Sequence, residues 1–345
     1  MDFFPTALTE TNFTNPINKE LEFTTYSGTQ ALRLLLRSLR LPQKAKVAIP
    51  AFVCSAVKAA VIVEGFIPVY LDLKGDHSFW TEYSTEEISN SGAQCVILVH
   101  LYGFLHPDTS SISAFCKANG IKLIHDAAQC YGIDKKAVSG DNGIVYSFGP
   151  GKSTTAAGGG WIIGIDKTFY DSEINNMPFY LFPNKKAEIS LSGRIYNHHT
   201  SAVKRVINKL ITKIKIPSGP IYKMANYQMQ AASLIISILD EINIKRNTNY
   251  HTLQSAALTN TKFSVAYYHT LGGYFKIVLF VKENPALFKE YLRKNSVPHL
   301  FLRDYIETVN LPNFLEKSDK FVELSCEACL PPEEIKRVAK ILADY

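Results

Sequence analysis

The sequence lacks any apolar run approaching the ~20 residues that a membrane-spanning helix needs, so it does not predict a transmembrane segment. Its first residues contain no basic stretch followed by an apolar one, and we therefore expect no signal peptide. Internal repeats and low-complexity segments are also absent. These absences favour a globular protein, and 345 residues are enough for a large core plus a smaller second domain.

Cysteine is scarce, with six residues in the chain, and several of them lie in apolar runs such as 94–99. In a chain of this length they predict buried free thiols in a reducing compartment, so we expect a cytoplasmic protein. The single Cys-x-x-Cys pair, Cys326 and Cys329, has no second pair to complete a zinc site. It also lies far from the early strand that a thioredoxin-like motif would follow, and we expect both thiols to be structural.

The net charge is weakly positive, at +6, which slightly favours anionic partners and does not by itself suggest nucleic acid. Part of it is concentrated in residues 191–223, which hold seven Lys and Arg residues and no Asp or Glu. Apolar residues at helical spacing predict a basic amphipathic helix over 202–215. We favour packing of this helix on its own domain or on a dimer partner. The alternatives are a patch for an anionic substrate and peripheral contact with a membrane surface.

From about residue 25 to residue 165, short strands alternate with helices of about ten residues, which is typical of an α/β domain with a mostly parallel sheet. The run 95–100 is almost continuously apolar, as expected for a strand that is buried on both faces. We expect strands at 46–50, 68–73, 95–100, 121–125, 145–148 and 160–164, and helices at 30–40, 55–64, 86–91 and 110–119.

The second half of the chain is organised differently. Residues 170–223 are polar and aromatic, and a long helix is expected over 225–245. Strands at 263–268 and 275–281 and helices at 284–293 and 332–344 follow. We therefore expect a large domain over 1–245, with a basic helical insertion at about 170–223, and a small α+β domain over 246–345.

A lone lysine, Lys152, lies in the small-residue loop 140–160, after a strand that ends in a carboxylate, Asp126. Pyridoxal phosphate (PLP) needs an amine that holds its aldehyde as a Schiff base and an acid that keeps its ring nitrogen protonated. Lys152 and Asp126 are therefore candidate catalytic residues, and proton transfer by Lys152 would require its amine to be neutral. Taken singly, each residue has an ordinary alternative: a surface lysine, and an aspartate that caps the next helix.

Two further motifs suggest phosphate binding. Residues 27–30 (SGTQ) open a helix, whose first-turn N–H groups attract phosphate, although an ordinary helix N-cap has the same composition. Residues 149–154 (GPGKST) resemble the end of a P-loop. However, Tyr146 stands where that motif requires glycine, and a glycine run and an apolar strand follow the lysine instead of a helix. We therefore do not expect an NTPase.

Seven motifs occur in one order along the chain. At this spacing the sequence resembles the DegT/DnrJ family of PLP-dependent sugar aminotransferases, mainly over residues 25–165 and 225–246. The motifs are 27–31 (SGTQA), 49–52 (IPAF), 65–72 (GFIPVYLD), 100–103 (HLYG), 126–129 (DAAQ), 146–152 (YSFGPGK) and 226–229 (NYQM).

The resemblance implies the PLP-dependent transferase fold type I, also called the aspartate-aminotransferase-like fold. This is an α/β large domain with a mostly parallel seven-stranded sheet flanked by helices, plus a small α+β C-terminal domain. It also implies transfer of an amino group, from glutamate, to a keto group of a nucleotide-activated sugar in amino-sugar or surface-polysaccharide biosynthesis. Members of the family work as homodimers with active sites at the subunit interface, which suits twofold symmetry.

The resemblance also assigns residues to the cofactor. Thr29, Gln30 and the Ser147 hydroxyl would bind its phosphate, Gln129 would lie near its phenolic oxygen, and Asn226 would reach the phosphate in the neighbouring subunit. The complete expected set is Gly28, Thr29, Gln30, Cys54, Asp126, Gln129, Ser147, Lys152 and Asn226.

The sequence departs from the family pattern at three places. Cys54 stands where an aromatic residue usually stacks on the cofactor ring, with Phe52 two residues earlier. Gln228 replaces an arginine, and residues 324–329 (LSCEAC) replace a Leu-Pro segment. Two alternatives therefore stay open: another PLP-dependent reaction on the same fold, and a non-catalytic member that binds a ligand or partner. Dehydrating members commonly carry histidine at the lysine position, so Lys152 disfavours that reaction.

Overall fold

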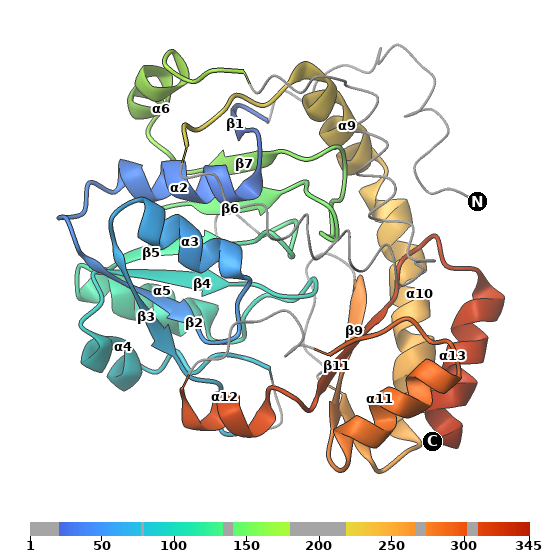
Figure 1. The fold of residues 1–345 in the computed structure, drawn as a ribbon. Coiled ribbons are helices and arrows are strands. Elements are labelled where there is room, and N and C mark those ends of the chain that lie inside the picture. Colours follow the sequence, from blue (N-terminus) through green and yellow to red (C-terminus); the bar gives the residue numbers. More distant parts are fainter. Residues whose placement is uncertain (1–20, 77–78, 134–140, 180–218, 266–273, 302–309) are drawn as a thin grey trace.

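The structure, a computed structural model, describes residues 21–76, 79–133, 141–179, 219–265, 274–301 and 310–345 (Figure 1). The predicted basic helix at 202–215 lies outside these ranges. Within them, every helix is too short or too polar to cross a bilayer.

A seven-stranded sheet forms the centre of the larger part of the molecule (Figure 1). Five neighbouring strands are parallel, in the order β6-β5-β4-β2-β3, and β7 and β1 complete one edge in antiparallel fashion. The predicted mostly parallel seven-stranded sheet is confirmed. The strands are β1 (Phe23–Thr25), β2 (Lys46–Pro50), β3 (Ile67–Leu71), β4 (Cys95–Val99), β5 (Lys122–Asp126), β6 (Ile144–Ser147) and β7 (Gly160–Ile163).

Helices cover both faces of this sheet, because side chains of successive strand residues point to opposite faces. In β4, Ile97 packs into the core shared with α2 and α3, whereas Leu98 packs into the core shared with α4 and α5. Farther along, Ala231 of α9 packs with Trp161. The helices are α2 (Gly28–Ser38), α3 (Ser55–Val63), α4 (Thr85–Ser91), α5 (Thr109–Ala118), α6 (Lys167–Ile174) and α9 (Asn226–Ser237).

The C-terminal part contains a four-stranded antiparallel sheet in the order β10-β11-β9-β8. Helices α10 and α13 pack together beside this sheet (Figure 1). The elements of this C-terminal part are β8 (Phe263–Val265), β9 (Lys276–Val281), β10 (Leu300–Phe301), β11 (Phe321–Ser325), α10 (Leu239–Leu258), α11 (Pro285–Lys294), α12 (Pro312–Lys317) and α13 (Pro332–Asp344).

The helix predicted over 225–245 is two helices in the structure. The backbone of Ile238 (φ −110°, ψ 8°) leaves the helical conformation, which separates α9 from α10. Helix α10 then continues to Leu258 and runs from the large sheet to the small one (Figure 1). The expected domain boundary at 245/246 falls inside this helix and stays a prediction.

The expectation of buried free thiols is confirmed for most cysteines. All six are free, and Cys95, Cys116, Cys130 and Cys326 are buried. Cys329 is half-buried, but Cys54 is exposed, because it precedes the first residue of α3 at the edge of the sheet.

A buried ion pair fixes helix α2 against the end of α3. Arg33 is 2% exposed, and its Nε lies 2.6 Å from Oε1 of Glu64, the C-terminal cap residue of α3. Arg37 donates to the other oxygen of the same carboxylate at 2.5 Å. Because both arginines lie on α2, this carboxylate holds the helix whose N-terminus reaches the carboxyl edge of the sheet.

We expect Glu64→Gln to lower the free energy of unfolding by about 3 kcal/mol, because it removes a carboxylate charge that contacts the buried guanidinium of Arg33 at 2.6 Å. The matched control is Asp171→Asn, which breaks an exposed pair with Lys167 and should have a much smaller effect, because solvent screens exposed charges. Urea unfolding followed by circular dichroism measures both values. Equal effects of the two substitutions would contradict the prediction.

Candidate active site

The parallel strands bring most of the predicted residues to one edge of the sheet. The carboxyl ends of β2, β4, β5 and β6 point the same way, and ligands of open α/β sheets bind at this edge. Asp126 ends β5 and Ser147 ends β6, while Cys54 and His100 follow β2 and β4. The parallel topology of the sheet therefore brings these residues, which are far apart in the sequence, to the same edge.

Asp126 is a buried carboxylate, 7% exposed, whose Oδ1 accepts a hydrogen bond from the backbone N–H of Ala128 at 3.0 Å. Burial raises the pKa of Asp126, while the charge of Lys152 and the Ala128 N–H act in the opposite direction. A buried carboxyl group of this kind is stabilised in its ionised form by a cation placed against it. A protonated pyridine nitrogen is such a cation.

Lys152 is half-buried in the loop between β6 and β7. Its backbone N–H donates to the Thr155 hydroxyl at 2.9 Å, and its carbonyl accepts from that hydroxyl at 2.7 Å. The Lys152 charge acts on Asp126, but the two side chains do not form a direct ion pair. The Lys152 amine therefore lies near the Asp126 carboxylate without a direct ion pair between them. Turns follow Lys152 instead of a helix, which agrees with the exclusion of a P-loop.

The start of α2 packs directly on the end of β6. A Cβ atom added to Gly28 would lie 2.6 Å from the Cβ of Ser147, so a larger residue would push the helix away from the strand. The Ser27 hydroxyl caps the helix by accepting from the Gln30 N–H at 3.3 Å. Within the described part of the chain, the N–H of Thr29 has no hydrogen-bond partner. This N–H and the nearby Ser147 hydroxyl suit a phosphate group.

The two predicted glutamines have side chains that support the surrounding loops. Gln30 is buried, and its Oε1 accepts from the Tyr222 N–H at 3.0 Å, which fastens the segment before α9 to α2. Oε1 of Gln129 accepts from the Tyr102 N–H at 3.3 Å, which joins the loops after β4 and β5. Direct contacts of Gln30 and Gln129 with a cofactor stay predictions.

The structure also locates the positions where the sequence departs from the family pattern. Phe52 is buried against Phe79 and Phe321, so it belongs to the core and does not take over the stacking role expected at the exposed Cys54. Gln228 is buried and binds within the chain, accepting from the Ala225 N–H at 3.0 Å and donating to the Ala157 carbonyl at 3.1 Å.

Asn226, the first residue of α9, is exposed. Its predicted contact with the cofactor phosphate of a neighbouring subunit stays a prediction.

The sequence profile of the DegT/DnrJ/EryC1/StrS aminotransferase family matches residues 6–342, almost the whole chain. The chain belongs to this family. The predicted family is therefore confirmed, and pyridoxal phosphate, the predicted cofactor, is the cofactor of its aminotransferases.

Curated relatives match about two fifths of the chain. A UDP-N-acetyl-3-dehydro-α-D-glucosamine 3-aminotransferase of Acidithiobacillus ferrooxidans is 36% identical over 145 residues, 41% of this chain and 39% of the relative. A GDP-perosamine synthase of Vibrio cholerae is 28% identical over 160 residues, 45% of this chain and 42% of the relative. The chain thus spans about two fifths of the length of these relatives.

Solved structures share the fold over nearly the whole chain. NtdA of Bacillus subtilis, solved with bound cofactor PMP, has a TM-score of 0.69 at 18% identity and covers 93% of this chain and 72% of its own. The predicted fold type I is confirmed. At this identity the similarity establishes the fold alone.

Sequence reasoning missed a line of buried polar side chains in this family member. Nδ1 of His100 accepts from the His106 N–H at 3.0 Å, so its Nε2 carries the proton and donates to Nδ1 of His125 at 3.0 Å. Nε2 of His125 in turn donates to Asp141 at 2.8 Å. His125 precedes Asp126, and the His100 N–H donates to the Asp126 carbonyl at 2.9 Å. These residues, which we call the histidine line, support the strand end that carries the catalytic candidate.

His106, at one end of the histidine line, is buried as a neutral ring. Its Nε2 donates to the Thr81 carbonyl at 3.3 Å, and its Nδ1 accepts from the Asp108 N–H at 3.2 Å. Burial lowers the pKa of His106 to about 4; the nearby Asp108 charge acts in the opposite direction, and the Lys74 charge lowers it further. The pKa of a histidine in the unfolded chain is about 6.5. Between about pH 6.5 and pH 4, His106 therefore binds a proton in the unfolded chain but not in the folded one.

We expect the burial of His106 to lower the free energy of unfolding as the pH falls from about 6.5 to about 4. Above this range it should have no effect on the pH dependence of stability. In His106→Gln, which keeps a donor for the Thr81 carbonyl, the free energy of unfolding should fall less steeply over this range of pH. Urea unfolding at several pH values measures this difference, with the exposed His251→Gln as control. Parallel curves for the wild type and His106→Gln would refute the prediction.

Proposed function

We propose that this chain is a PLP-dependent aminotransferase that moves an amino group from a donor such as glutamate to a keto group of a nucleotide-activated sugar. Family membership supports the reaction class. The observation that carries the proposal is a buried carboxyl, Asp126, at the ligand-binding edge of a parallel sheet, within electrostatic reach of Lys152 but not paired with it.

The residues at this edge fit the cofactor. When bound, PLP supplies an electron sink for the substrate carbon that exchanges its amino group. Asp126 would hold the ring nitrogen in its protonated form, and the start of α2 with Ser147 would hold the phosphate. Lys152 would bind the cofactor and, when released, carry a proton at the reacting carbon in its neutral form. Gln129 would orient the loop beside the ring oxygen.

The substrate class follows from the names of the relatives. One is an aminotransferase for a UDP-linked keto sugar and another is a GDP-perosamine synthase, so they share a nucleotide-linked sugar and differ in the base and the sugar. The proposal therefore extends to nucleotide-activated keto sugars as a class, with use in amino-sugar or surface-polysaccharide biosynthesis.

Three further proposals accompany this function. The protein works as a homodimer in which Asn226 of one subunit completes the phosphate site of the other, and its exposed place at the start of α9 supports this. It resides in the cytoplasm, as its six free cysteines suggest. Residues 1–245 form the cofactor domain and residues 246–345 the small domain.

Lys152→Ala should abolish amino transfer, because the substitution removes the amine that binds the cofactor in this proposal. Release of 2-oxoglutarate from glutamate, assayed with a panel of nucleotide keto-sugars, measures the activity. Borohydride reduction followed by peptide mapping should place the reduced cofactor on Lys152 in the wild type. The exposed Lys167→Ala is the control and should keep full activity. A label on a different amine would overturn the assignment, and turnover with a simple keto acid alone would change the substrate class.

Asp126→Asn should retain cofactor bound at Lys152 yet lower kcat by on the order of 10²-fold, the scale for losing one group that stabilises developing charge. The amide is similar in size but does not hold the ring nitrogen in its protonated form. The same assay measures kcat, and visible absorbance confirms that the cofactor is bound. An unchanged kcat with full cofactor occupancy would exclude the proposed role of Asp126.

A further inference from the structure

Arg246, on α10, is a buried cation that no motif of the sequence singled out. It is 3% exposed, and arginine is almost never buried this fully unless its charge is paired. Its Nη1 donates to the Ser153 carbonyl at 2.7 Å, and its Nε and Nη2 donate to Oε2 of Glu327 at 3.0 and 2.7 Å. One guanidinium thus joins the loop that carries Lys152 to the segment after β11.

Ser153, whose carbonyl accepts from Arg246, directly follows Lys152 in the sequence. Backbone hydrogen bonds of Lys152 close on Thr155 inside the same loop, so they shape the loop without fixing it to the small domain. The Ser153 hydroxyl is buried and has no hydrogen-bond partner among the described residues. The carbonyl of Ser153 is therefore the polar group through which α10 holds this residue.

Glu327 is itself held in place, which makes it a firm support for the guanidinium. The side-chain amide of Asn249, also on α10, donates to the Cys326 carbonyl at 3.3 Å and to the Glu327 carbonyl at 3.0 Å. The Cys326 N–H donates to the Phe275 carbonyl at 3.0 Å. The segment 326–329, which looked like an isolated Cys-x-x-Cys pair in the sequence, thus presents a carboxylate to the Lys152 loop through Arg246.

The residue type matters because the guanidinium binds Ser153 and Glu327 in different directions, in addition to a longer contact with Asn243 at 3.5 Å. Two of its nitrogens bind the Glu327 carboxylate while a third reaches the Ser153 carbonyl. Its plane also lies over the Phe275 ring, 5.9 Å from the ring centre. A lysine would keep the positive charge but has a single nitrogen, so it would not hold both partners in this geometry.

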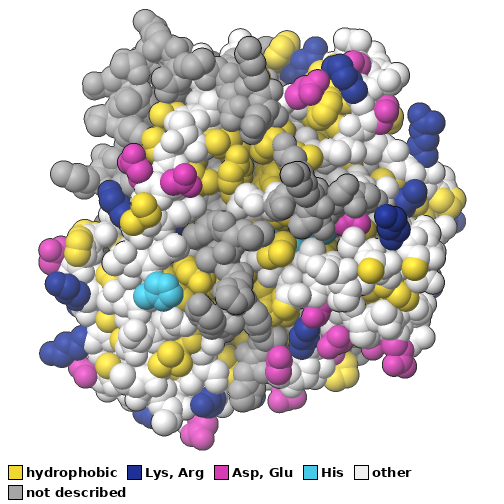
Figure 2. All heavy atoms as spheres, turned by 180° about the vertical axis from the view of Figure 1, so that it is seen from behind, with side chains coloured by type: hydrophobic (Ala, Val, Ile, Leu, Met, Phe, Trp, Pro, Cys, Tyr) yellow, Lys and Arg dark blue, Asp and Glu magenta, His cyan; other side chains and the backbone are white. Residues whose placement is uncertain are grey.

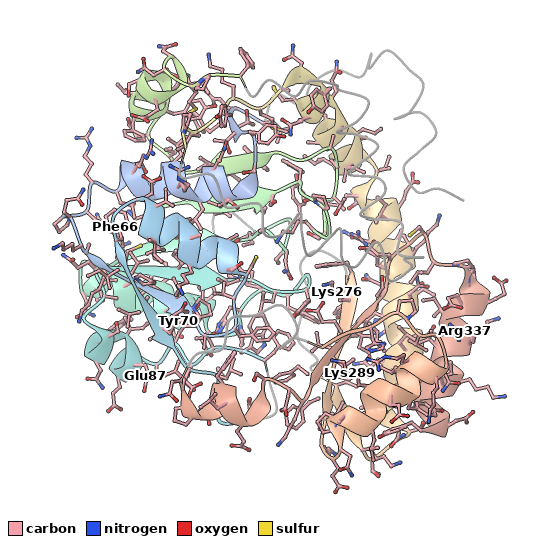
Figure 3. All side chains as sticks on the ribbon, in the orientation of Figure 1. Phe66, Tyr70, Glu87, Lys276, Lys289 and Arg337 are labelled. Atoms are coloured by element: carbon pink, nitrogen blue, oxygen red, sulfur yellow. The ribbon has the colours of Figure 1, made fainter. Side chains whose placement is uncertain are left out.

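A second buried contact between the two sheets provides a matched comparison. The Tyr102 hydroxyl, in the loop after β4, donates to Oε1 of Glu323 on β11 at 2.5 Å, and Lys276 pairs with the same carboxylate. Figure 3 shows Lys276 on β9, on the side of the small sheet that faces the large one. This contact is of the same chemical kind, but it does not include the loop of Lys152.

We propose that Arg246, supported by Glu327, is a positioning residue that holds the 149–158 loop so that Lys152 faces Asp126. The residue acts through the Ser153 carbonyl and does not touch the reacting groups. The consequence for catalysis rests on the function proposed above, whereas the restraint on the loop is a property of the chain itself. The small domain thereby controls the placement of the amine in the large one.

The restraint is tested first on the full-length protein without cofactor. Hydrogen exchange read by mass spectrometry should show the amides of residues 149–158 exchanging on the order of tenfold faster in Arg246→Lys and Glu327→Gln than in the wild type. Amides of β4 should be unchanged. Glu323→Gln, which disturbs the Tyr102 contact, should leave the 149–158 loop as it is. Equal loop exchange in the wild type and Arg246→Lys would overturn the proposal.

The second test uses protein loaded with PLP. In Arg246→Lys, the apparent pKa of the visible absorbance band should shift and kcat should fall at least ~10-fold, while the KM for the sugar stays the same, because the amine is displaced but the sugar site is not. A purely structural role would instead lower thermal stability and leave the band and kcat of the folded fraction unchanged. If the wild type takes up no PLP, the proposed function fails while the exchange result still decides the restraint.

Discussion

The chemistry proposed for this protein depends on two groups that lie near each other without a direct ion pair: a carboxyl group that the sheet buries and an amine in the loop after the next strand. Burial raises the pKa of Asp126, and the Lys152 charge offsets this only in part. A cation in direct contact with Asp126 would occupy the place that the proposal gives to the protonated ring nitrogen. The carboxyl edge of parallel strands keeps the groups apart, because Asp126 ends β5 whereas Lys152 lies in the loop that follows β6.

Helix α10, strand β11 and helix α12 all contact loops that follow strands of the large sheet. Arg246 reaches the Lys152 loop, and Glu323 reaches Tyr102, whose neighbours in the loop after β4 include His100. Farther away, both oxygens of Asp72, just after β3, accept from the N-terminal N–H groups of α12. On the face shown in Figure 2, Lys and Arg side chains of the described residues are scattered among acidic ones.

The sequence predicted the features that repeat along the chain. Alternating apolar runs predicted β2, β4 and β5 within a residue or two, and motif order predicted the family. The roles of Asp126 and Lys152 stay predictions. Features that depend on single contacts were not predictable: apolar spacing runs unbroken through Ile238, where the helix ends. Likewise, Phe52 entered the core and Gln30 bound Tyr222, because rings and amides find partners that only the folded chain places beside them. Arg246 carried no signal for its contacts with Ser153 and Glu327, since these two residues lie 93 and 81 positions away in the sequence.

The histidine line has a fixed polarity, and this limits what it does. Every donor in it points toward Asp141, beginning with the backbone N–H of His106. A peptide nitrogen does not release its proton, so a hop along the imidazoles has no source at that end and the direction of donation does not reverse. The line is thus a fixed chain of hydrogen bonds that holds the end of β5 in place and does not conduct protons along it.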